Sequence, residues 1–343
     1  MSSHINLSFC IPTYNKVERV MESISAILSN PSTDIEVVVL DNGSTDNTLE
    51  SLKAIKDERL IIYENGENKG ALFNMVNVLD KGSGKFLVYL TDQDSVNPIE
   101  INNFRDFLLG QNNLAGGYCR FNSNAIIDFE IFNQGYDAVC NIGYLGRHPT
   151  GYFFNRSMMK TIKHVDRFSD YSFVDLFPLE FVFAELGILG NGAVYHRAIF
   201  RPETGKRVGE SKSSTTKGQS SRAFFSPDSR LKMTLNYIKH IDTLDLDSSQ
   251  KKKTNTIVFA RGLISATFGY RSILQNDRLC AHYNMKKRRL KMREVMTIGY
   301  NFYTGFFQKS SVIHANRVEF GSRAVFVVLA NLYTKVKKAT SRN

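Results

Sequence analysis

The segment GKFLVYLTDQDS, residues 84–95, joins a strand-like apolar run to two closely spaced carboxylates. Its apolar part, residues 86–90, has the length and composition of a buried β-strand. The run ends on Asp92 and Asp94, with Gln93 between them. Ligands bind beyond the carboxyl ends of the strands in an open α/β sheet, and Asp-x-Asp suits a divalent cation that bridges to phosphate. The alternative interpretation is an Asx-rich turn after a core strand.

Three strand–helix units precede this segment. Strand-like apolar runs occupy residues 5–11, 35–40 and 59–63, and helical spacing follows each of them in residues 17–28, 47–55 and 71–79. This alternation predicts an α/β fold with a mainly parallel sheet and right-handed crossovers. Because parallel strands end at one edge, we expect the segments PTYN (12–15), DNGSTD (41–46) and TDQD (91–94) to line one binding cleft.

The remaining part of the chain is less regular. We expect helices at residues 97–109 and within 175–186, and strands at 115–120 and 193–195, whereas residues 122–143 show no clear period. Farther on, helical spacing is found in residues 231–241, 254–270, 296–307 and 324–336.

Charge is distributed unevenly along the 343 residues. Residues 1–200 hold 16 Lys and Arg against 24 Asp and Glu, and residues 201–343 hold 28 against 9. We therefore expect three parts: an α/β domain (1–200), a basic, Gly- and Ser-rich loop (201–225) and a basic helical region (226–343). A basic region of this kind suits phosphates, an anionic membrane surface or nucleic acid.

Cysteine usage and hydropathy bear on the compartment. The four cysteines are scattered without a Cys-x-x-Cys pair, and no signal-peptide pattern precedes them, so we expect reduced, buried thiols in a cytoplasmic protein. The longest apolar run, residues 324–333, is about half of the ~20 residues that a membrane helix needs. We expect the chain not to span a membrane.

Four motifs occur in a family-specific order over residues 5–95. PTYN, VVVLDNGSTDNT, ENKGALFNMVN and TDQDS together resemble the nucleotide-sugar-binding half of family 2 glycosyltransferases with the GT-A fold. The resemblance implies a Rossmann-like, mixed and mainly parallel sheet flanked by helices. It also implies a non-processive, inverting hexosyl- or deoxyhexosyltransferase of the capsule or O-antigen type, which uses Mn²⁺ or Mg²⁺ and a UDP-, dTDP-, GDP- or CDP-sugar.

The resemblance implies roles for the strand-end residues. The donor would contact Pro12, Thr13, Tyr14, Asp41, Asn42, Asn68, Lys69, Asp92 and Gln93. The metal would be bound by Asp94, with Asp92 and His196 as further ligands. Family members often have a second acid at position 42. The amide of Asn42 therefore leaves the identity of the nucleotide base open. The alternatives are that Tyr14 belongs to the core, that Ser44 and Asp46 cap a helix, and that His196 binds no metal.

Acceptor binding and proton transfer are expected between residues 122 and 186. By resemblance, residues 122–143 form the acceptor side and LGRHPTGYFFNR (145–156) closes the sugar pocket. Within that segment, His148, Gly151 and Tyr152 are expected on the acceptor side. An inverting transfer needs a carboxylate base. Where the family usually shows an acidic pair, this chain has Leu179 and Glu180, so Glu180 is the first candidate base and Asp175 the second. Glu185 is expected to be an exposed helix charge, and His148 is alternatively a surface histidine.

The basic loop allows two interpretations. In one it is a solvated linker; in the other it is a lid whose Lys206, Arg207, Lys212 or Lys217 contacts the donor diphosphate. The segment QSSR (219–222) resembles the Gln-x-x-Arg-Trp motif of processive members, but Ala223 replaces the tryptophan and the chain has no Trp. The sequence therefore argues against a processive synthase.

The basic helical region suggests the kind of acceptor. The run MKKRRLKMR, residues 285–293, and its amphipathic neighbours suit a face lying on an anionic bilayer at the inner side of the cell membrane, or a helical hairpin with a solvated cationic side. The first interpretation favours a lipid-linked glycan acceptor in surface polysaccharide biosynthesis.

Three other functions are compatible with parts of the sequence. A nucleic-acid-binding protein would explain the basic region but not the strand-end motifs, so no nucleic acid partner is expected. A nicotinamide dehydrogenase is argued against because no Gly-x-Gly-x-x-Gly follows the first strand. A catalytically inactive relative that binds nucleotide sugars remains open because of Asn42 and the missing acidic pair.

Overall fold

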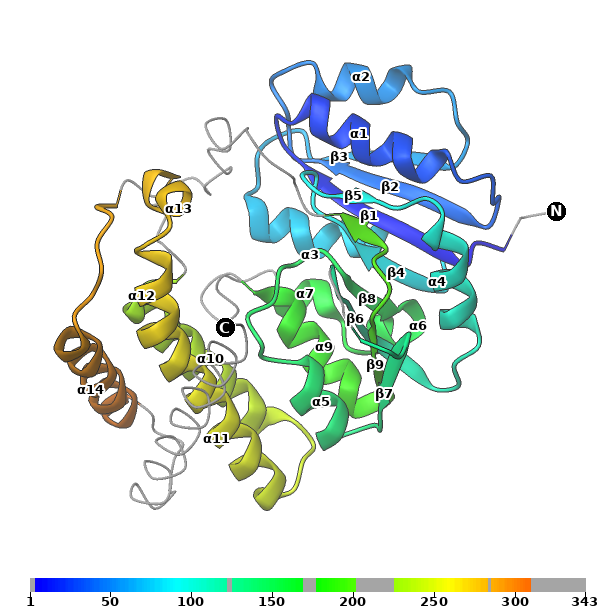
Figure 1. Ribbon diagram of the computed structural model, residues 1–343. Coiled ribbons are helices and arrows are strands. Elements are labelled where there is room, and N and C mark those ends of the chain that lie inside the picture. Colours follow the sequence, from blue (N-terminus) through cyan, green and yellow to red (C-terminus); the bar gives the residue numbers. More distant parts are fainter. Residues whose placement is uncertain (1–3, 122–124, 169–176, 202–224, 283–284, 310–343) are drawn as a thin grey trace. The chain divides into compact units, whose positions relative to one another are not determined.

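The computed structural model describes residues 4–121, 125–168, 177–201, 225–282 and 285–309 (Figure 1). The chain divides into two compact units, residues 1–219 and 220–343. The boundary between the units lies within residues 201–225, the segment predicted to be a basic loop.

The first unit contains an eight-stranded mixed sheet in the order β3-β2-β1-β4-β8-β6-β9-β7. Its strands are β1 Leu7–Thr13, β2 Ile35–Asp41, β3 Leu60–Glu64, β4 Phe86–Tyr89, β6 Leu114–Cys119, β7 Phe129–Phe132, β8 Tyr152–Asn155 and β9 Asn191–Tyr195. Strands β1 to β4 are parallel, which confirms the predicted parallel sheet. Strand β8 is antiparallel to both neighbours, β4 and β6, and β7 is antiparallel to β9. A separate two-stranded sheet pairs β5 Ser95–Val96 with β10 Phe200–Arg201.

Helices cover both faces of this sheet. They are α1 Val17–Leu28, α2 Thr48–Ala54, α3 Ala71–Lys81, α4 Glu100–Leu109, α5 Tyr136–Ile142, α6 Arg156–Thr161, α7 His164–Phe168 and α9 Pro178–Leu189. Alternate residues of β1, including Phe9, pack against α1 and α4, as period-2 side-chain alternation requires. Helix α3 contacts β1 and β2 from the other face (Figure 1).

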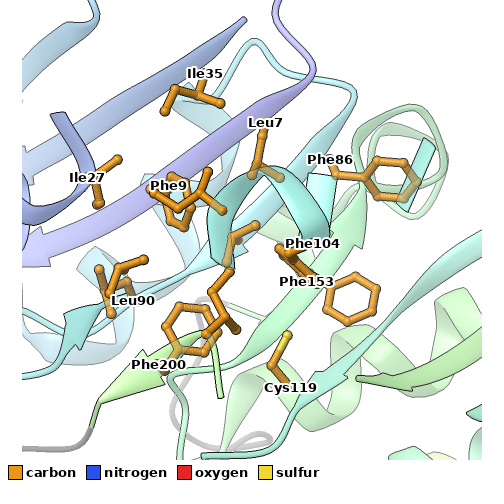
Figure 2. Packing of buried hydrophobic residues seen from close by; sticks show 14 of the residues in the cluster. Leu7, Phe9, Ile27, Ile35, Phe86, Leu90, Phe104, Cys119, Phe153 and Phe200 are labelled. Atoms are coloured by element: carbon orange, nitrogen blue, oxygen red, sulfur yellow. The ribbon is translucent and has the colours of Figure 1, made fainter. Parts of the chain in front are cut away.

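Aromatic side chains fill the core beneath the strand ends (Figure 2). Phe104 of α4 meets the ring of Phe153 edge-on, with centroids 5.4 Å apart, and lies 5.0 Å from the ring of Tyr195. All three side chains are buried, and burying a side chain of this size is worth roughly 1.5–3 kcal/mol. The core therefore joins α4, β8 and β9 into one rigid support.

The predicted irregularity of residues 122–143 is wrong for half of that stretch. It contains strand β7 and helix α5. Strand β7 has four residues and lies at the edge of the sheet with Phe129 and Ile131 exposed, so it is too short to give a clear strand pattern. Residues 136–142 make only a seven-residue helix, which is too short for a clear period.

The described part of the second unit is helical. It contains α10 Pro227–Thr243, α11 Ser248–Ile264, a π-helical turn at Ser265–Gly269, α12 Tyr270–Ile273, α13 Asp277–His282 and α14 Met292–Lys309. Ser226 caps α10 with Pro227 in its first turn, and Asp247 with Gln250 forms a capping box on α11. Among the described residues, no helix combines the length and apolar character needed to cross a membrane.

Candidate active site

The ends of β1, β2 and β4 meet at one edge of the sheet. Thr13 pairs in register with Asp41, and the Asn42 backbone N–H donates to the Thr13 carbonyl oxygen at 2.9 Å. The Thr13 hydroxyl donates to Asp92 Oδ2 at 3.1 Å. The structure thus brings the PTYN, DNGSTD and TDQD segments together, as the strand pattern predicted.

Asp94 is the most tightly held carboxylate at this edge. Its side chain is buried, and its Oδ2 accepts hydrogen bonds from Thr91 Oγ1 at 2.7 Å and Thr150 Oγ1 at 2.6 Å. The same oxygen lies 3.5 Å from His148 Nδ1, whose ring is about half exposed. Ser23 of α1 donates to the Asp94 carbonyl oxygen. Asp94 is therefore fixed from β4, from α1 and from the loop before β8.

Asp92 is half-buried and sits in a less polar setting. Burial raises the pKa of its carboxyl group to about 6, and the nearby Asp94 charge acts in the same direction. The Thr13 hydroxyl and the Lys16 charge oppose this rise. Asp92 is therefore ionised at neutral pH but titrates within the range at which many proteins remain folded.

Asp41 organises its own turn. Its Oδ2 accepts from the backbone N–H groups of Gly43 at 3.1 Å and Ser44 at 2.9 Å, and its Oδ1 accepts from the Ser44 hydroxyl. Gly43 has φ +73°, and a Cβ there would lie 2.6 Å from the backbone carbon of Glu67, so glycine is required. Ser44 Oγ also accepts from the Asn15 N–H at 2.9 Å, which ties the PTYN segment to this turn.

Asn42 is buried, and its amide is fully used within the protein. Its Nδ2 donates to Asn68 Oδ1 at 3.0 Å and to the Gly70 carbonyl at 3.3 Å. Its Oδ1 accepts from Asn65 Nδ2 at 2.9 Å and from the Lys69 N–H at 3.1 Å. An aspartate could accept the last two bonds but could not donate the first two. The departure from an acid at this position therefore has a structural reason: the amide fixes the loop of residues 65–70.

Neither helix-cap alternative gives the N-cap residue of α2, which is Asn47. Asp46 precedes it, and its Oδ1 accepts from the Thr48 backbone N–H at 3.0 Å. Ser44 instead bonds to Asp41 and Asn15. Pro12, Tyr14 and Gln93 are half-buried at the same edge. The exposed Lys69 places its ammonium group 5.2 Å from the centre of the Phe73 ring.

Two residues expected on the acceptor side are parts of the sheet. Gly151 has φ +108°, and a Cβ there would lie 2.8 Å from the Cys119 carbonyl oxygen. Its N–H donates to the Tyr89 carbonyl at 3.2 Å, and its own carbonyl accepts from the Cys119 N–H at 2.8 Å. Tyr152 is buried. Both residues serve the insertion of β8 between β4 and β6, so the expected direct contact of Tyr152 with an acceptor is not supported.

Glu180 lies in the first turn of α9 and is 1% exposed. Its Oε1 accepts from the Arg147 backbone N–H at 2.9 Å and from the Tyr152 hydroxyl at 3.3 Å. The Arg147 guanidinium lies 4.5 Å from the centre of the Tyr118 ring. Glu180 thus supports the loop that carries His148 and Thr150 to Asp94. Glu185, expected to be exposed, is largely covered and pairs with Arg167.

His196 follows β9 and contacts a different acid. Its Nε2 lies 2.9 Å from Glu130 Oε2 on β7, and its backbone N–H donates to the Asp128 carbonyl at 2.7 Å. In the described part of the chain, no group of three or more His, Cys, Asp or Glu side chains is arranged to bind a metal ion. The metal role of His196 stays a prediction.

Several predicted residues lie outside the described part of the chain. These are Asp175, Lys206, Arg207, Lys212 and Lys217. Their roles remain predictions from the sequence.

A comparison with known families assigns the segment that carries the strand-end residues. Residues 8–172 match the model of Glycosyl transferase family 2. Over this segment, which is nearly half of the chain, the protein is similar to glycosyltransferase family 2.

Similar proteins include bacterial glucosyltransferases. The Escherichia coli UDP-Glc:alpha-D-GlcNAc-diphosphoundecaprenol beta-1,3-glucosyltransferase WfgD is 29% identical over 126 residues, 35% of this chain and 49% of that protein. The Campylobacter jejuni GalNAc(5)-diNAcBac-PP-undecaprenol beta-1,3-glucosyltransferase is 32% identical over 93 residues, 26% of this chain and 30% of that protein. The chain thus spans less than half the length of these curated relatives.

Similarity in fold extends over a longer part of the chain than similarity in sequence. A crystal structure of S. aureus TarS superposes with a TM-score of 0.59 at 16% identity, over 90% of this chain and 50% of that one. The structure of TarS 1-349 superposes with a TM-score of 0.55 at 13% identity, over 88% and 92% of the two chains. This likeness confirms the predicted GT-A-type architecture.

The donor set at Asp94 fits a divalent ion that arrives with substrate. Asp94 Oδ2 and His148 Nδ1 lie 3.5 Å apart, and Asp92 lies two residues earlier in the same loop. Mg²⁺ and similar ions are commonly bound by one or two carboxylates together with substrate phosphate oxygens. A site with few protein ligands is therefore compatible with a metal ion that is bound together with substrate phosphate oxygens.

Sequence reasoning missed three residues of the domain that fix the predicted ones. Thr91 and Thr150 both donate to Asp94, and Arg147 connects the loop before β8 to Glu180. Thr91 had a usable signal, since it is a hydroxyl residue at the strand end directly before the acidic pair. The contact of Thr150 with a residue 56 positions earlier has no signature in the sequence.

Proposed function

We propose that the protein transfers a sugar, with inversion, from a nucleotide diphosphate donor to a hydroxyl group of a glycan. The observation that carries this proposal is the meeting of Thr13, Asp41, Asp92 and Asp94 at three adjacent parallel strand ends within a family 2 domain. Strand ends of this kind are where open α/β sheets bind their ligands.

The donor would bind at the strand ends, beside the PTYN turn and the TDQD loop. Thr13 and Tyr14 border the base side, and the 65–70 loop presents Asn68 and Lys69. Asp94, with His148 and Asp92, would bind Mn²⁺ or Mg²⁺, and His196 remains the further candidate ligand from the sequence. When bound, such an ion offsets the negative charge of the diphosphate leaving group. The lid residues Lys206, Arg207, Lys212 and Lys217 would add positive charge.

We assign the base to Asp175, the second sequence candidate. A base must reach the acceptor hydroxyl within hydrogen-bond distance. Glu180 is buried, and its Oε1 already accepts from Arg147 and Tyr152. Glu180 then acts as a positioning residue for the loop of His148 and Thr150.

The acceptor we propose is a lipid-linked glycan in surface polysaccharide biosynthesis, used on the cytoplasmic side of the membrane. The names of the E. coli and C. jejuni relatives both specify diphosphoundecaprenol-type acceptors. The WfgD name also specifies UDP-glucose, so UDP-sugars are tested first, before dTDP-, GDP- and CDP-sugars.

The test is release of nucleoside diphosphate from each donor, with and without an undecaprenyl-diphosphate-linked sugar. We expect one donor to be consumed only with acceptor and Mn²⁺ present, and ¹H NMR of the product to show the opposite anomeric configuration from the donor. Retention of configuration, or no turnover of any donor, would contradict the proposal.

A second candidate function is nucleotide-sugar binding without transfer. The burial of Glu180, where the family usually has an acidic pair, favours it. Tight donor binding with no turnover under any acceptor condition would establish this alternative.

A further inference from the structure

Beyond its first turn, helix α14 has an outward face without charge. Val295, Phe302 and Phe306 are buried on its inner side. On the outer side, Met292, Met296 and Tyr300 are 50%, 70% and 68% exposed. Their spacing of four residues places them in one row along the helix.

This row is unusual for a surface helix. No Asp, Glu, Lys or Arg occurs between residues 295 and 308, so Thr297 and Asn301 are the polar neighbours of the row. The outward face of a helix in a globular protein normally carries charged residues. An exposed apolar row bordered by polar groups indicates a contact surface.

A dense cationic segment leads into the same helix. Its six exposed cations are Lys286, Lys287, Arg288, Arg289, Lys291 and Arg293. Leu290 is 1% exposed within this run and packs with Leu274 and Val295, so the segment is anchored to the base of α14.

Only part of this charge is neutralised. Lys287 pairs with Asp277 at 2.7 Å, and Arg288 pairs with Glu294 at 2.7 Å. Within the described ranges, the other four cations form no salt bridge. The charge faces solvent beside the apolar row.

We propose that residues 286–300, the α14 surface, dock on an anionic lipid bilayer. A bilayer interface accepts both features at once: Met and Tyr side chains enter the headgroup region, and Lys and Arg meet anionic lipid headgroups. Nucleic acid would satisfy the cations but would leave Met292 and Met296 without an apolar partner.

Charge complementarity argues against the other occupants. Residues 310–343 of the same chain contain six Lys and Arg and a single acid, Glu319, so they would be repelled by the cationic segment. A second copy would bring the same positive surface. An anionic partner is the one that this surface attracts.

The experiment is flotation of the full chain with lipid vesicles. We expect binding to vesicles containing phosphatidylglycerol, weaker binding at high salt, and none to phosphatidylcholine alone. The double variant Arg289→Glu/Arg293→Glu should bind at least about tenfold more weakly. The matched variant Lys239→Glu/Lys253→Glu reverses two exposed charges on α10 and α11 and should bind as the wild type does.

The apolar row is tested separately. Met296→Ser/Tyr300→Ser should lose the binding that persists at high salt, because that part depends on insertion of apolar side chains. Unchanged thermal unfolding of each variant verifies the fold. Equal binding of wild type and Arg289→Glu/Arg293→Glu would overturn the proposal.

Two other results would also overturn it. One is tight oligonucleotide binding with no vesicle binding. The other is a concentration-dependent dimer in sedimentation, dissolved by Met296→Ser, with no vesicle binding. No donor sugar enters these assays, so their outcome is independent of the proposed sugar transfer.

Discussion

The donor half and the acceptor half of the candidate site are built differently. In the donor half, Thr13, Asp41 and Asp92 follow adjacent parallel strands and contact one another or their own turns. In the acceptor half, Gly151, Tyr152 and Glu180 are used to insert an antiparallel strand and to fix the loop before it. The register of the parallel strands positions the residues of the donor half. Packing between segments that are distant in the sequence positions the residues of the acceptor half.

This difference separates two kinds of functional residue. The strand-end groups lie at the edge where open sheets bind their ligands, although Thr13, Asp41 and Asp94 are themselves buried. Residues on an inserted strand are consumed by the hydrogen bonds and packing that the insertion requires. In the proposed function, the acceptor half would affect the chemistry through His148 and Thr150, which reach Asp94 from the loop.

The largest expected effect concerns the base. Asp175→Asn should lower kcat by about 10³-fold with an unchanged donor KM, since removal of a general base typically costs 10²–10⁴-fold. Glu180→Gln should stay within about tenfold of wild type, because the Gln carbonyl oxygen still accepts from Arg147 and Tyr152. Steady-state kinetics on both variants decides between them. If Glu180→Gln lowered kcat strongly and Asp175→Asn did not, Glu180 would be the base and would take part in the chemistry together with the donor half.

Gly151→Ala should destabilise the first unit by about 2–4 kcal/mol. Its positive φ costs roughly 1–3 kcal/mol for an L-residue, and the added Cβ would meet the Cys119 carbonyl oxygen at 2.8 Å. Gly135→Ala is the matched control, because Gly135 has φ +89° with nothing within 4 Å. Urea unfolding of both variants measures the difference. Equal losses of unfolding free energy in the two variants would mean that the contact of the added Cβ with the Cys119 carbonyl oxygen costs nothing.

Asn42→Asp should destabilise the donor half by about 1–3 kcal/mol, since the new carboxylate cannot donate to Asn68 and Gly70 and is buried. Asn133→Asp, on an exposed residue, serves as the control. Chemical unfolding at neutral pH checks this result. If Asn42→Asp were as stable as the control, the amide would be free for the donor base.

The smallest effect is the pH dependence from Asp92. Donor affinity should fall as the pH falls through about 6, roughly tenfold per pH unit below the pKa, because protonation removes the carboxylate charge. The folding contribution has the opposite sign: the raised pKa favours the folded state at low pH, and this is lost as the pH rises through about 6. Calorimetric titration at several pH values checks the first effect. The donor affinity of Asp92→Asn should lack this pH dependence. If the variant and the wild type had the same pH profile, another group would be responsible for it.

The sequence predicted the donor half well because each feature is local. The strand of β1, the turn at Asp41–Ser44 and the acidic pair are short patterns, and parallel pairing brings them to one edge without further information. Helix α1 occupies residues 17–28 as predicted, since a full amphipathic period is present.

The acceptor half was less predictable because its contacts join distant residues. The Thr150 hydroxyl reaches Asp94 across 56 positions, and the Tyr152 hydroxyl reaches Glu180 across 28. No local pattern in the sequence predicts that Glu180, in the first turn of α9, is buried. The burial of Tyr152 likewise follows from the antiparallel position of β8, which the strand–helix alternation did not reveal.

The most direct test of the central claim is donor binding at Asp94. Isothermal titration of UDP-sugars in Mn²⁺ is compared for wild type, Asp94→Asn and the control Asp80→Asn, which changes an exposed acid of α3. The predicted result is metal-dependent binding by wild type and Asp80→Asn, abolished by EDTA and weakened about 100-fold or more in Asp94→Asn. Binding of the donor by Asp94→Asn with wild-type affinity in Mn²⁺ would contradict the account.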